Sequence, residues 1–264
     1  MERYVIRGGQ AGYDRLQMLA RDRWPSTRAL FARAQVGAGM RCVDLGCGGG
    51  AVTIELAKLV APDGAVVGVD MDEVELALAR EAATNRGITN VEFRALNVHA
   101  WDEPAAYDVV FCRFLLHHVS QPVDVLRRMW AAVRPGGVII VEDADFDGWC
   151  WYPDNEGFAF FLRMYRETLK RAGGDHALGR KLYTYFLDAG IPDASVTLIN
   201  PIHIADEGKA LAHSTLEATA AAIIAEGLAT EDELTTALES MAALTADPHS
   251  LISGPRIFQL WRRR

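Results

Sequence analysis

The sequence predicts an α/β protein built on an open, mostly parallel sheet with helices on both faces. Between residues 40 and 142, short apolar runs alternate with stretches that have helical spacing, and Gly or Pro stands at the joins. A glycine-rich turn follows the first apolar run, where a strand would pass into a helix. Alternation of this kind is satisfied by parallel strands joined through helices that cover the sheet.

The predicted elements follow in a regular order. Strands are expected at 40–45, 65–69, 91–96, 107–112 and 138–142, with helices at 51–60, 73–86 and 123–133. Upstream, apolar residues at helical spacing predict helix over about 13–36, with Pro25 starting a second helix. Downstream, an aromatic-rich loop at 143–153 precedes helices at 158–171, 179–189, 208–226 and 231–244, and strands at 195–204 and 255–261.

Composition excludes several classes of function. The chain has 264 residues, half of them hydrophobic, which suffices for a core without disulfides or metals. Its formal net charge of −8 disfavours a nucleic-acid partner. No apolar run approaches the ~20 residues of a membrane helix. The four cysteines (Cys42, Cys47, Cys112 and Cys150) form no C-x-x-C pair, so we expect reduced thiols and a cytoplasmic protein.

The most specific feature is the glycine-rich segment Asp-Leu-Gly-Cys-Gly-Gly-Gly at 44–50, after the first predicted strand. Glycines in such a turn adopt positive φ and let a ligand approach the backbone closely. In open α/β sheets, ligands bind at the carboxyl ends of the strands. Asp70 ends the second predicted strand, where its carboxylate can accept hydrogen bonds from both hydroxyls of a ribose.

Two kinds of nucleotide cofactor suit this arrangement. Gly46, Gly48 and Ala51 satisfy the G-x-G-x-x-G/A fingerprint of nicotinamide-dependent oxidoreductases, with an acidic residue about 20 positions on. Asp44 favours the other kind. A carboxylate beside the loop would repel a pyrophosphate, but it suits a cofactor that carries an ammonium and a sulfonium.

With these motifs in place, the chain resembles the class I S-adenosylmethionine (SAM)-dependent methyltransferases of the small-molecule type. Residues 44–50 match the family's D-x-G-x-G-x-G motif, 107–110 with 116–119 match its fourth-strand region, and 134–137 match the R-P-G-G turn before strand five. The likeness covers roughly 41–143. It implies a Rossmann-like fold with a mostly parallel seven-stranded sheet, helices on both faces and a helical cap, and an antiparallel closing strand at 257–261.

The resemblance also implies a division of the chain. Residues 1–36 would form an N-terminal helical cap segment, and residues 37–264 a SAM-binding methyltransferase domain. We expect this domain to carry cap insertions at about 144–190 and 206–247, because those segments hold no family motif.

Carried over position by position, the resemblance distributes the cofactor along the strand ends. Asp44, Gly46 and Gly48 would face its methionine part, Asp70 its ribose and Met71 its adenine. Where the family often has an acid that accepts from the adenine amino group, this chain has Asn97, whose carbonyl can also accept. The arginine after strand four would lie by the methionine end, or could instead pair with a substrate carboxylate. The implied cofactor-binding residues are Asp44, Gly46, Cys47, Gly48, Gly50, Asp70, Met71, Asn97, Val98 and Arg113.

Three polar residues are candidates for the chemistry at the methyl acceptor. His117 and His118 follow the fourth strand and Asp143 ends the fifth, and the resemblance places them around the acceptor. A base is needed only if the acceptor has a proton to lose. Because the two histidines are adjacent, only one is expected to face the pocket. For the same reason, and for want of a third ligand at metal spacing, no metal site is expected.

Aromatic residues on the 143–153 loop suggest where the acceptor binds. Trp149, Trp151 and Tyr152 are expected to line an apolar pocket that holds a small molecule. The sequence does not decide whether the chain forms a homo-oligomer.

The sequence therefore favours SAM-dependent methyl transfer to a small molecule, with O- or N-methylation of a partly apolar metabolite expected first and S-adenosylhomocysteine as product. Two alternatives remain open. One is a protein of the same fold that binds SAM without transferring methyl, and the other is a nicotinamide-dependent oxidoreductase. A methyltransferase acting on macromolecules is disfavoured by the acidic composition.

Overall fold

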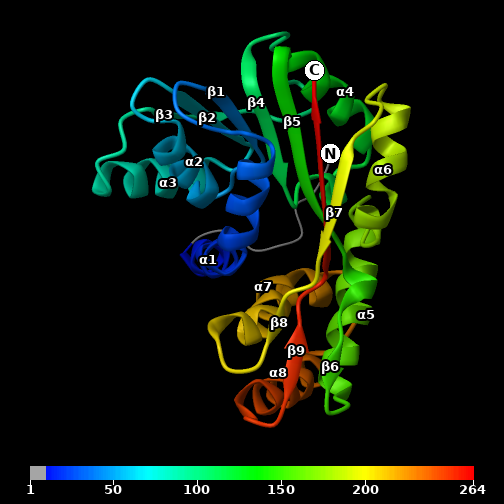
Figure 1. The fold of residues 1–264 in the computed structure, drawn as a ribbon. Helices are drawn as coiled ribbons and strands as arrows, with labels where there is room; N and C mark the ends of the chain where they lie inside the picture. Colours follow the sequence, from blue (N-terminus) through cyan, green and yellow to red (C-terminus); the bar gives the residue numbers. More distant parts are fainter. Residues whose placement is uncertain (1–9) are drawn as a thin grey trace.

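The computed structural model describes residues 10–264, so residues 1–9 of the predicted N-terminal cap segment lie outside the described part. Its main feature is a seven-stranded sheet in the order β3-β2-β1-β4-β5-β10-β7 (Figure 1). The predicted mostly parallel sheet is confirmed: β1 to β5 run parallel, and β10 is antiparallel to both β5 and β7. The strands are β1 (Arg41–Leu45), β2 (Ala65–Asp70), β3 (Val91–Ala95), β4 (Tyr107–Arg113), β5 (Val133–Asp145), β7 (Ser195–Ile199) and β10 (Arg256–Arg263).

Helices cover both faces of this sheet because the central strands are apolar on both sides. Val109 and Phe111 of β4 pack with α1 (Gln10–Arg33) and α2 (Ala51–Val60), and α3 (Glu73–Asn85) continues that layer. The alternate residues Val110 and Cys112 pack with α4 (Pro122–Ala132) and α6 (Leu178–Asp188) on the opposite face.

A second, smaller lobe lies below the carboxyl end of the sheet in Figure 1 and is called the cap here. It contains α5 (Glu156–Arg171), α7 (Leu211–Ala225), α8 (Glu231–Ala246) and a three-stranded sheet of β6 (Trp151–Tyr152), β9 (Leu251–Ser253) and β8 (Ile202–His203). Short 3-10 turns complete the fold: η1 (Leu116–His118), η2 (Phe146–Gly148) and η3 (Glu207–Ala210). The cap has its own apolar core, which includes Phe158, Phe161, Leu216 and Met241.

Three sequence-based predictions about these elements were wrong. Pro25 does not start a second helix but lies inside the continuous α1, whose buried Leu30 and Phe31 hold the helix against the sheet. The strand predicted at 195–204 divides into β7 and β8, because Pro201 has no N–H to donate to a ladder. The third concerns α6, which lies within the predicted cap insertion 144–190 but packs on β5 and β10 with Leu182 and Phe186.

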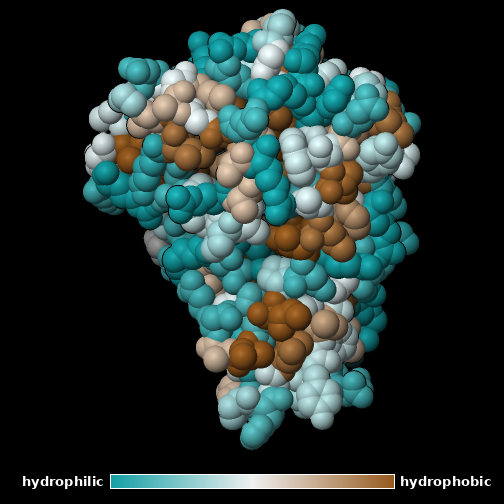
Figure 2. Space-filling model, in the orientation of Figure 1, coloured by the Kyte–Doolittle hydropathy of each residue, from teal (hydrophilic) through white to brown (hydrophobic). Residues whose placement is uncertain are grey.

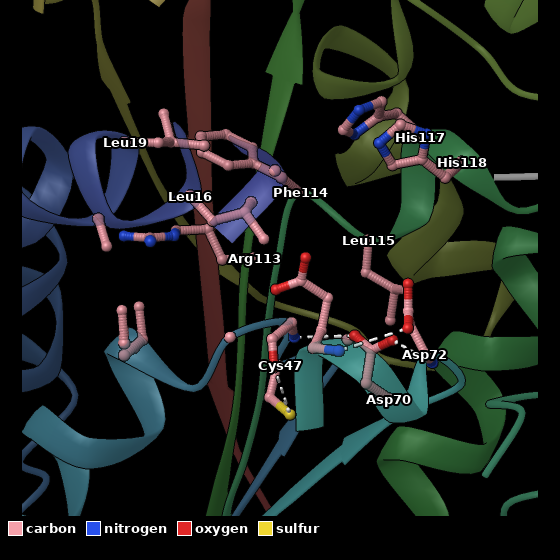
Figure 3. A pocket seen from close by; sticks show the side chains of 18 of the residues that line it. Leu16, Leu19, Cys47, Asp70, Asp72, Arg113, Phe114, Leu115, His117 and His118 are labelled. Atoms are coloured by element: carbon pink, nitrogen blue, oxygen red, sulfur yellow. Dashed lines mark hydrogen bonds between the residues drawn. The ribbon is translucent and has the colours of Figure 1, made fainter. Parts of the chain in front are cut away.

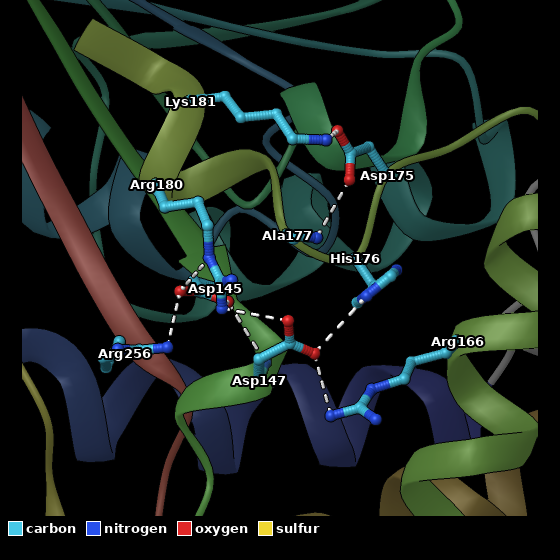
Figure 4. Close-up of polar contacts among 9 residues, drawn as sticks. All are labelled: Asp145, Asp147, Arg166, Asp175, His176, Ala177, Arg180, Lys181 and Arg256. Atoms are coloured by element: carbon cyan, nitrogen blue, oxygen red, sulfur yellow. Dashed lines mark hydrogen bonds and ion pairs between the residues drawn. The ribbon is translucent and has the colours of Figure 1, made fainter.

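A cluster of charged side chains joins the cap to the sheet (Figure 4). Asp145, at the end of β5, is fully buried; its carboxylate accepts two hydrogen bonds from Arg180 of α6, at 2.8 and 2.6 Å. Arg256 of β10 approaches the same carboxylate to 2.9 Å. Asp147 of η2 pairs with Arg166 of α5 at 2.8 Å and with Arg180 at 2.9 Å. The cluster thus ties one cap helix to three elements of the sheet domain.

Apolar side chains are also exposed along one edge of the molecule. Figure 2 shows hydrophobic patches on the face that carries β7 and β8. Val196, Leu198, Ile202 and Ile204 are between 44 and 62% exposed there.

A buried polar network anchors the second half of α1. Thr27 donates from Oγ1 to Oε2 of Glu142 at 2.7 Å and accepts from Nη1 of Arg113 at 3.2 Å. Gln259 of β10 donates to the other oxygen of Glu142 at 2.6 Å. Burial raises the pKa of Glu142, and the facing guanidinium of Arg113 opposes that shift. These bonds therefore fix α1 to β4, β5 and β10 at one point.

We expect Thr27→Val to destabilise the protein by about 2 kcal/mol, because a buried carboxylate loses a hydroxyl donor at nearly constant volume. Chemical denaturation followed by circular dichroism measures the change. Thr27→Ser keeps the hydroxyl and should lose much less. Equal losses in both variants would show that packing of the Thr27 methyl, rather than the hydrogen bond, holds α1.

Candidate functional site

The glycine-rich loop between β1 and α2 adopts a conformation that only glycine takes without strain. Gly46, Gly48 and Gly50 have φ values of 70°, 48° and 71°. The backbone N–H groups of Gly46 and Cys47 both donate to the carbonyl of Val69 in β2. A Cβ on Gly50 would approach Ala79 and Phe93 to 2.8 Å, so this glycine permits close packing of the loop on α3 and β3.

Asp70 holds this loop from the end of β2. One carboxylate oxygen accepts from the Gly48 N–H at 2.8 Å, and the other accepts from the Asp72 N–H at 3.0 Å. Asp72 in turn caps α3 with its own carboxylate. Burial raises the pKa of Asp70, and the backbone donors offset part of that shift. Each oxygen keeps acceptor capacity for a further donor, such as a ribose hydroxyl.

Asp44 lies at the end of β1, under the loop, and is only 3% exposed. Its carboxylate accepts from Thr53 Oγ1 at 2.7 Å. Burial raises its pKa to about 7, and the hydrogen bond from Thr53 and the nearby charge of Arg113 oppose the shift. A second acid at the cavity, Glu75 of α3, also has a pKa raised by burial to about 7. Both carboxyl groups would be stabilised in the charged form by a cationic ligand.

One cavity of about 510 Å³ extends from this loop to the cap. Figure 3 shows Asp70 and Asp72 on one side of it, Arg113 on another and the two histidines on a third, with Phe114 and Leu115 between them. The structure brings nearly all the predicted cofactor residues to this cavity: Asp44, Gly46, Cys47, Gly48, Asp70, Met71, Asn97, Val98 and Arg113 line it. Gly50 does not line it; it precedes α2 and packs behind the loop.

Both histidines line the cavity, which corrects the expectation that only one could. They belong to the 3-10 turn η1 rather than to an extended segment, and their ring centroids lie 3.9 Å apart. His117 is buried, and its Nδ1 lies 2.6 Å from Oδ1 of Asp143. Asp143 is fixed in turn by the N–H groups of Leu116 and Ala144, at 2.9 and 2.7 Å. These backbone hydrogen bonds fix the carboxylate of Asp143 and, through it, the ring of His117. The two residues are called the dyad below.

His118 is in a different electrostatic environment. Burial lowers the pKa of its imidazole well below 6.5, and the neighbouring charges of His117 and Arg15 lower it further. His118 is therefore neutral at physiological pH, whereas the ring of His117 is oriented by its contact with the carboxylate of Asp143.

Of the three aromatic residues predicted to line the acceptor pocket, only Trp149 does so. Trp151 lies in β6 and stacks on Phe158 at 4.6 Å between ring centroids, within the cap core. Tyr152 is 69% exposed on the outside of the same strand. The prediction failed for these two because the segment is a strand of the cap sheet rather than a loop, so its side chains alternate between core and solvent.

Sequence reasoning missed most of the acceptor side of the cavity. One face of α1 lines it with side chains spaced three and four residues apart: Arg15, Leu16, Leu19, Ala20 and Arg23. The cap contributes Phe146, Trp149, Tyr165, Leu211, Thr215 and Pro255. The contribution of α1 could have been found from the sequence, because Arg15 and Arg23 interrupt its apolar face at a helical interval. The cap residues carried no comparable pattern.

Within the part of the chain described, one group of side chains has a composition that could hold a metal ion: Asp22, His203 and Asp206, where α1 meets η3. Nδ1 of His203 lies 2.7 Å from Asp206 and 3.6 Å from Asp22. Arg23 also forms an ion pair with Asp22, so one of the two carboxylates in this group already has a cationic partner.

Comparison with known proteins identifies the family. A family model described as a methyltransferase domain matches residues 37–184, more than half of the chain, so the protein belongs to this methyltransferase family. The cofactor of the site is accordingly S-adenosylmethionine, which the charges and glycine loop described above fit.

Curated relatives agree with the family over part of their length. The chain is 38% identical over 102 residues to a ubiquinone biosynthesis O-methyltransferase of Acinetobacter baumannii, which covers 38% of this chain and 42% of the relative. The chain thus matches less than half of the length of that enzyme. Because the match covers less than half of either protein, it does not identify the substrate of this chain.

Solved structures share the fold. The YcgJ protein of Bacillus subtilis has a TM-score of 0.59 at 16% identity, covering 91% of this chain and 99% of that one. The [4+2]-cyclase SpnF has a TM-score of 0.54 at 17% identity, covering 91% and 80%. At such identities these likenesses establish the architecture alone.

The raised pKa of Asp44 predicts a pH-dependent cofactor affinity. If Asp44 binds the ammonium of the cofactor, it must be ionised to do so, and binding then displaces a proton at pH values below about 7. The affinity for S-adenosylhomocysteine should therefore fall as the pH drops from 8 to 6, by up to ~10-fold per unit below the pKa. Calorimetric titrations at several pH values measure this.

Asp44→Asn should bind more weakly and lose most of the slope. Glu75→Gln separates the contribution of the second acid whose pKa is also raised to about 7. An affinity that is constant between pH 6 and 8 in the unmodified protein would contradict the role given to Asp44.

Proposed function

We propose that this protein transfers a methyl group from S-adenosylmethionine to a small-molecule acceptor, and that the attacking atom is an oxygen or nitrogen that must lose a proton. The observation that carries the proposal is the His117–Asp143 dyad, in which His117 lines the same cavity as the glycine loop and Asp70, and Asp143 lies behind it. Family membership supports methyl transfer, and the size of the cavity supports a small acceptor.

Each of the cofactor residues would bind the part of S-adenosylmethionine that suits its charge. Asp44 suits the methionine ammonium, Arg113 the methionine carboxylate, and Asp70 the ribose hydroxyls. Met71, which is 55% exposed, and Asn97 also line the cavity and would face the adenine. When bound, S-adenosylmethionine supplies a methyl group already activated by its sulfonium, so the protein needs mainly to align the acceptor with it.

The dyad would handle the acceptor proton. If Nδ1 of His117 donates to Asp143, Nε2 is the nitrogen that can take the proton lost by an attacking hydroxyl, or by a neutral amine as it is methylated. Asp143 is held by backbone donors and can stabilise the imidazolium that forms. His118 would stay neutral and would help to position the acceptor. This assignment favours a proton-bearing acceptor over one that is methylated by alignment alone.

The acceptor half of the cavity suits a partly apolar metabolite. Its walls are mainly aromatic and aliphatic, from Phe114, Phe146, Trp149, Tyr165 and Leu211. Such a surface excludes water around the reacting atoms, which favours methyl transfer over hydrolysis.

We further propose a cytoplasmic protein. All four cysteines are free thiols, and Cys42 and Cys112 are buried in the core. Among the described residues, none of the helices combines the length and apolarity needed to cross a bilayer. Whether the chain assembles with copies of itself stays an open prediction.

Turnover of S-adenosylmethionine to S-adenosylhomocysteine against a panel of hydroxylated and amino-bearing metabolites tests the function. Product formation that depends on an added acceptor supports it. Binding of the cofactor without turnover for any acceptor would favour the non-transferring alternative, and tighter binding of NAD would favour the oxidoreductase.

With an acceptor from that panel, His117→Ala should lower kcat by at least ~100-fold, because the general base is lost. The affinity for S-adenosylhomocysteine should stay within ~3-fold, since His117 lies at the acceptor side. His118→Asn is the matched variant and should cost less in kcat. A His117→Ala enzyme with nearly normal kcat and an unchanged pH–rate profile would show that no base is needed.

Cofactor binding should also order the first half of α1. Leu16 and Tyr13 of this helix lie against Gly48 and Gly49 of the loop, so a cofactor on the loop would be covered by them. Hydrogen exchange with and without S-adenosylhomocysteine should show added protection between residues 12 and 23. The buried segment around Leu30 and Phe31 serves as the internal reference and should not change. Absence of any gain in the first half would rule out a covering role.

A further inference from the structure

A buried arginine lies among apolar side chains at the cap end of the cavity. Arg23 of α1 is 2% exposed and lines the cavity together with Leu211, Thr215 and Pro255 of the cap. Its guanidinium lies against the backbone of Gly254, where there is no room for a Cβ. Burial lowers its pKa, and Asp22 offsets the shift, so Arg23 keeps its charge.

The hydrogen bonds of Arg23 are incomplete. Nη1 forms an ion pair with the carboxylate of Asp22, but neither Nη1 nor Nε has a hydrogen-bond partner among the described residues. A buried donor without an acceptor costs roughly 1–3 kcal/mol, so such groups call for an explanation. A missing ligand would supply one.

Other arginines of the chain show what this edge of a guanidinium binds. Arg21, two residues earlier on α1, uses Nε and Nη2 to hold both oxygens of Glu207, at 2.9 and 2.8 Å. Arg180 holds Asp145 through the same two nitrogens, at 2.8 and 2.6 Å. Planar two-point contact of this kind matches a carboxylate. The same edge of Arg23 holds no carboxylate in the described structure.

Arg23 lies against Gly254, in the segment between β9 and β10, and within reach of the charge of Arg113. Burial lowers the pKa of Arg23 most, the charge of Asp22 raises it, and the charge of Arg113 lowers it. Arg113 is the arginine whose charge acts on Asp44, the acid of the glycine loop. The third arginine at the cavity, Arg15, lies instead near Glu75 and His118, whose pKa values its charge lowers.

We propose that the Nε–Nη2 edge of Arg23 binds a carboxylate on the methyl acceptor, so that the substrates are hydroxy or amino acids with an apolar body. This inference rests on the proposed function only in that it calls the ligand a methyl acceptor. The binding of a carboxylate to Arg23 does not itself depend on turnover. Arg23 would fix one end of the substrate and the His117–Asp143 dyad would receive the proton at the other. The apolar walls between them would hold the body of the molecule.

Binding of matched probes tests the proposal. The probes are hydroxybenzoates, hydroxycinnamates and hydroxyphenylacetates, each paired with its methyl ester, titrated calorimetrically into protein saturated with S-adenosylhomocysteine. At least one free acid should bind 10-fold or more tightly than its ester. Arg23→Met should abolish that preference while leaving the affinity for S-adenosylhomocysteine within about 2-fold, and Arg23→Lys should keep part of it.

Arg21→Met is the control, because it removes an exposed arginine of the same helix that pairs with Glu207. It should leave the preference for acids intact. If Arg23→Met does not fold, the double variant Asp22→Asn with Arg23→Met removes the pair together and serves in its place.

Several outcomes would overturn the inference. Wild-type protein that binds none of the acids, or binds acid and ester equally, would contradict a carboxylate site. Loss of S-adenosylhomocysteine binding in Arg23→Met with acid preference retained would assign Arg23 to the cofactor. Methyl transfer confined to neutral acceptors would refute the inference and leave the proposed function standing. Acid binding that depends on Arg23, without turnover of any acceptor, would refute the proposed function and leave this inference standing.

Discussion

Buried carboxylates at the carboxyl ends of the strands impose the main constraint on this molecule. Asp44, Glu142 and Asp143 are each at most 3% exposed, and a buried charge is tolerated only where donors and counter-charges surround it. The sheet alone supplies few of these. The rest come from Thr53 of α2, Thr27 of α1 and the backbone of η1, so satisfying the carboxylates fixes where these elements lie. Of these carboxylates Asp44 lines the cavity itself, and Asp143 acts on it through His117, which also lines it.

The sheet and the cofactor side could be predicted because their signals are local. Positive φ at Gly46 and Gly48 and an acid after β2 are needed by the turn itself, so residue type at a few adjacent positions reveals them. The histidine pair shows the limit of such reasoning. Its two rings share the cavity only because η1 turns tightly, and no residue type at 117 or 118 announces a 3-10 turn.

The acceptor side could not be predicted because it is assembled from distant segments. Arg23, Tyr165 and Thr215 meet only after α1, α5 and α7 have packed together, and each of these residue types is common on helices. Trp151 looked like a pocket residue and is a core residue of the cap, since an aromatic side chain serves either purpose. Pro25 looked like a helix start, yet packing of Leu30 and Phe31 against the sheet outweighs the hydrogen bond that proline removes.

The way the chain passes between the sheet domain and the cap has a mechanical consequence. It crosses four times: after β5, between α5 and α6, between β7 and β8, and between β9 and β10. A hinge motion of the cap would have to bend all four crossings together, and two of them are short links between strands already held in sheets. The covering half of α1 continues from the anchored end past Pro25 and is otherwise held by side-chain contacts, such as Leu16 on Gly48 and Arg21 on Glu207. Ligand entry and exit should therefore depend on bending of one helix near Pro25, and the shape of the acceptor pocket should stay nearly constant through the catalytic cycle.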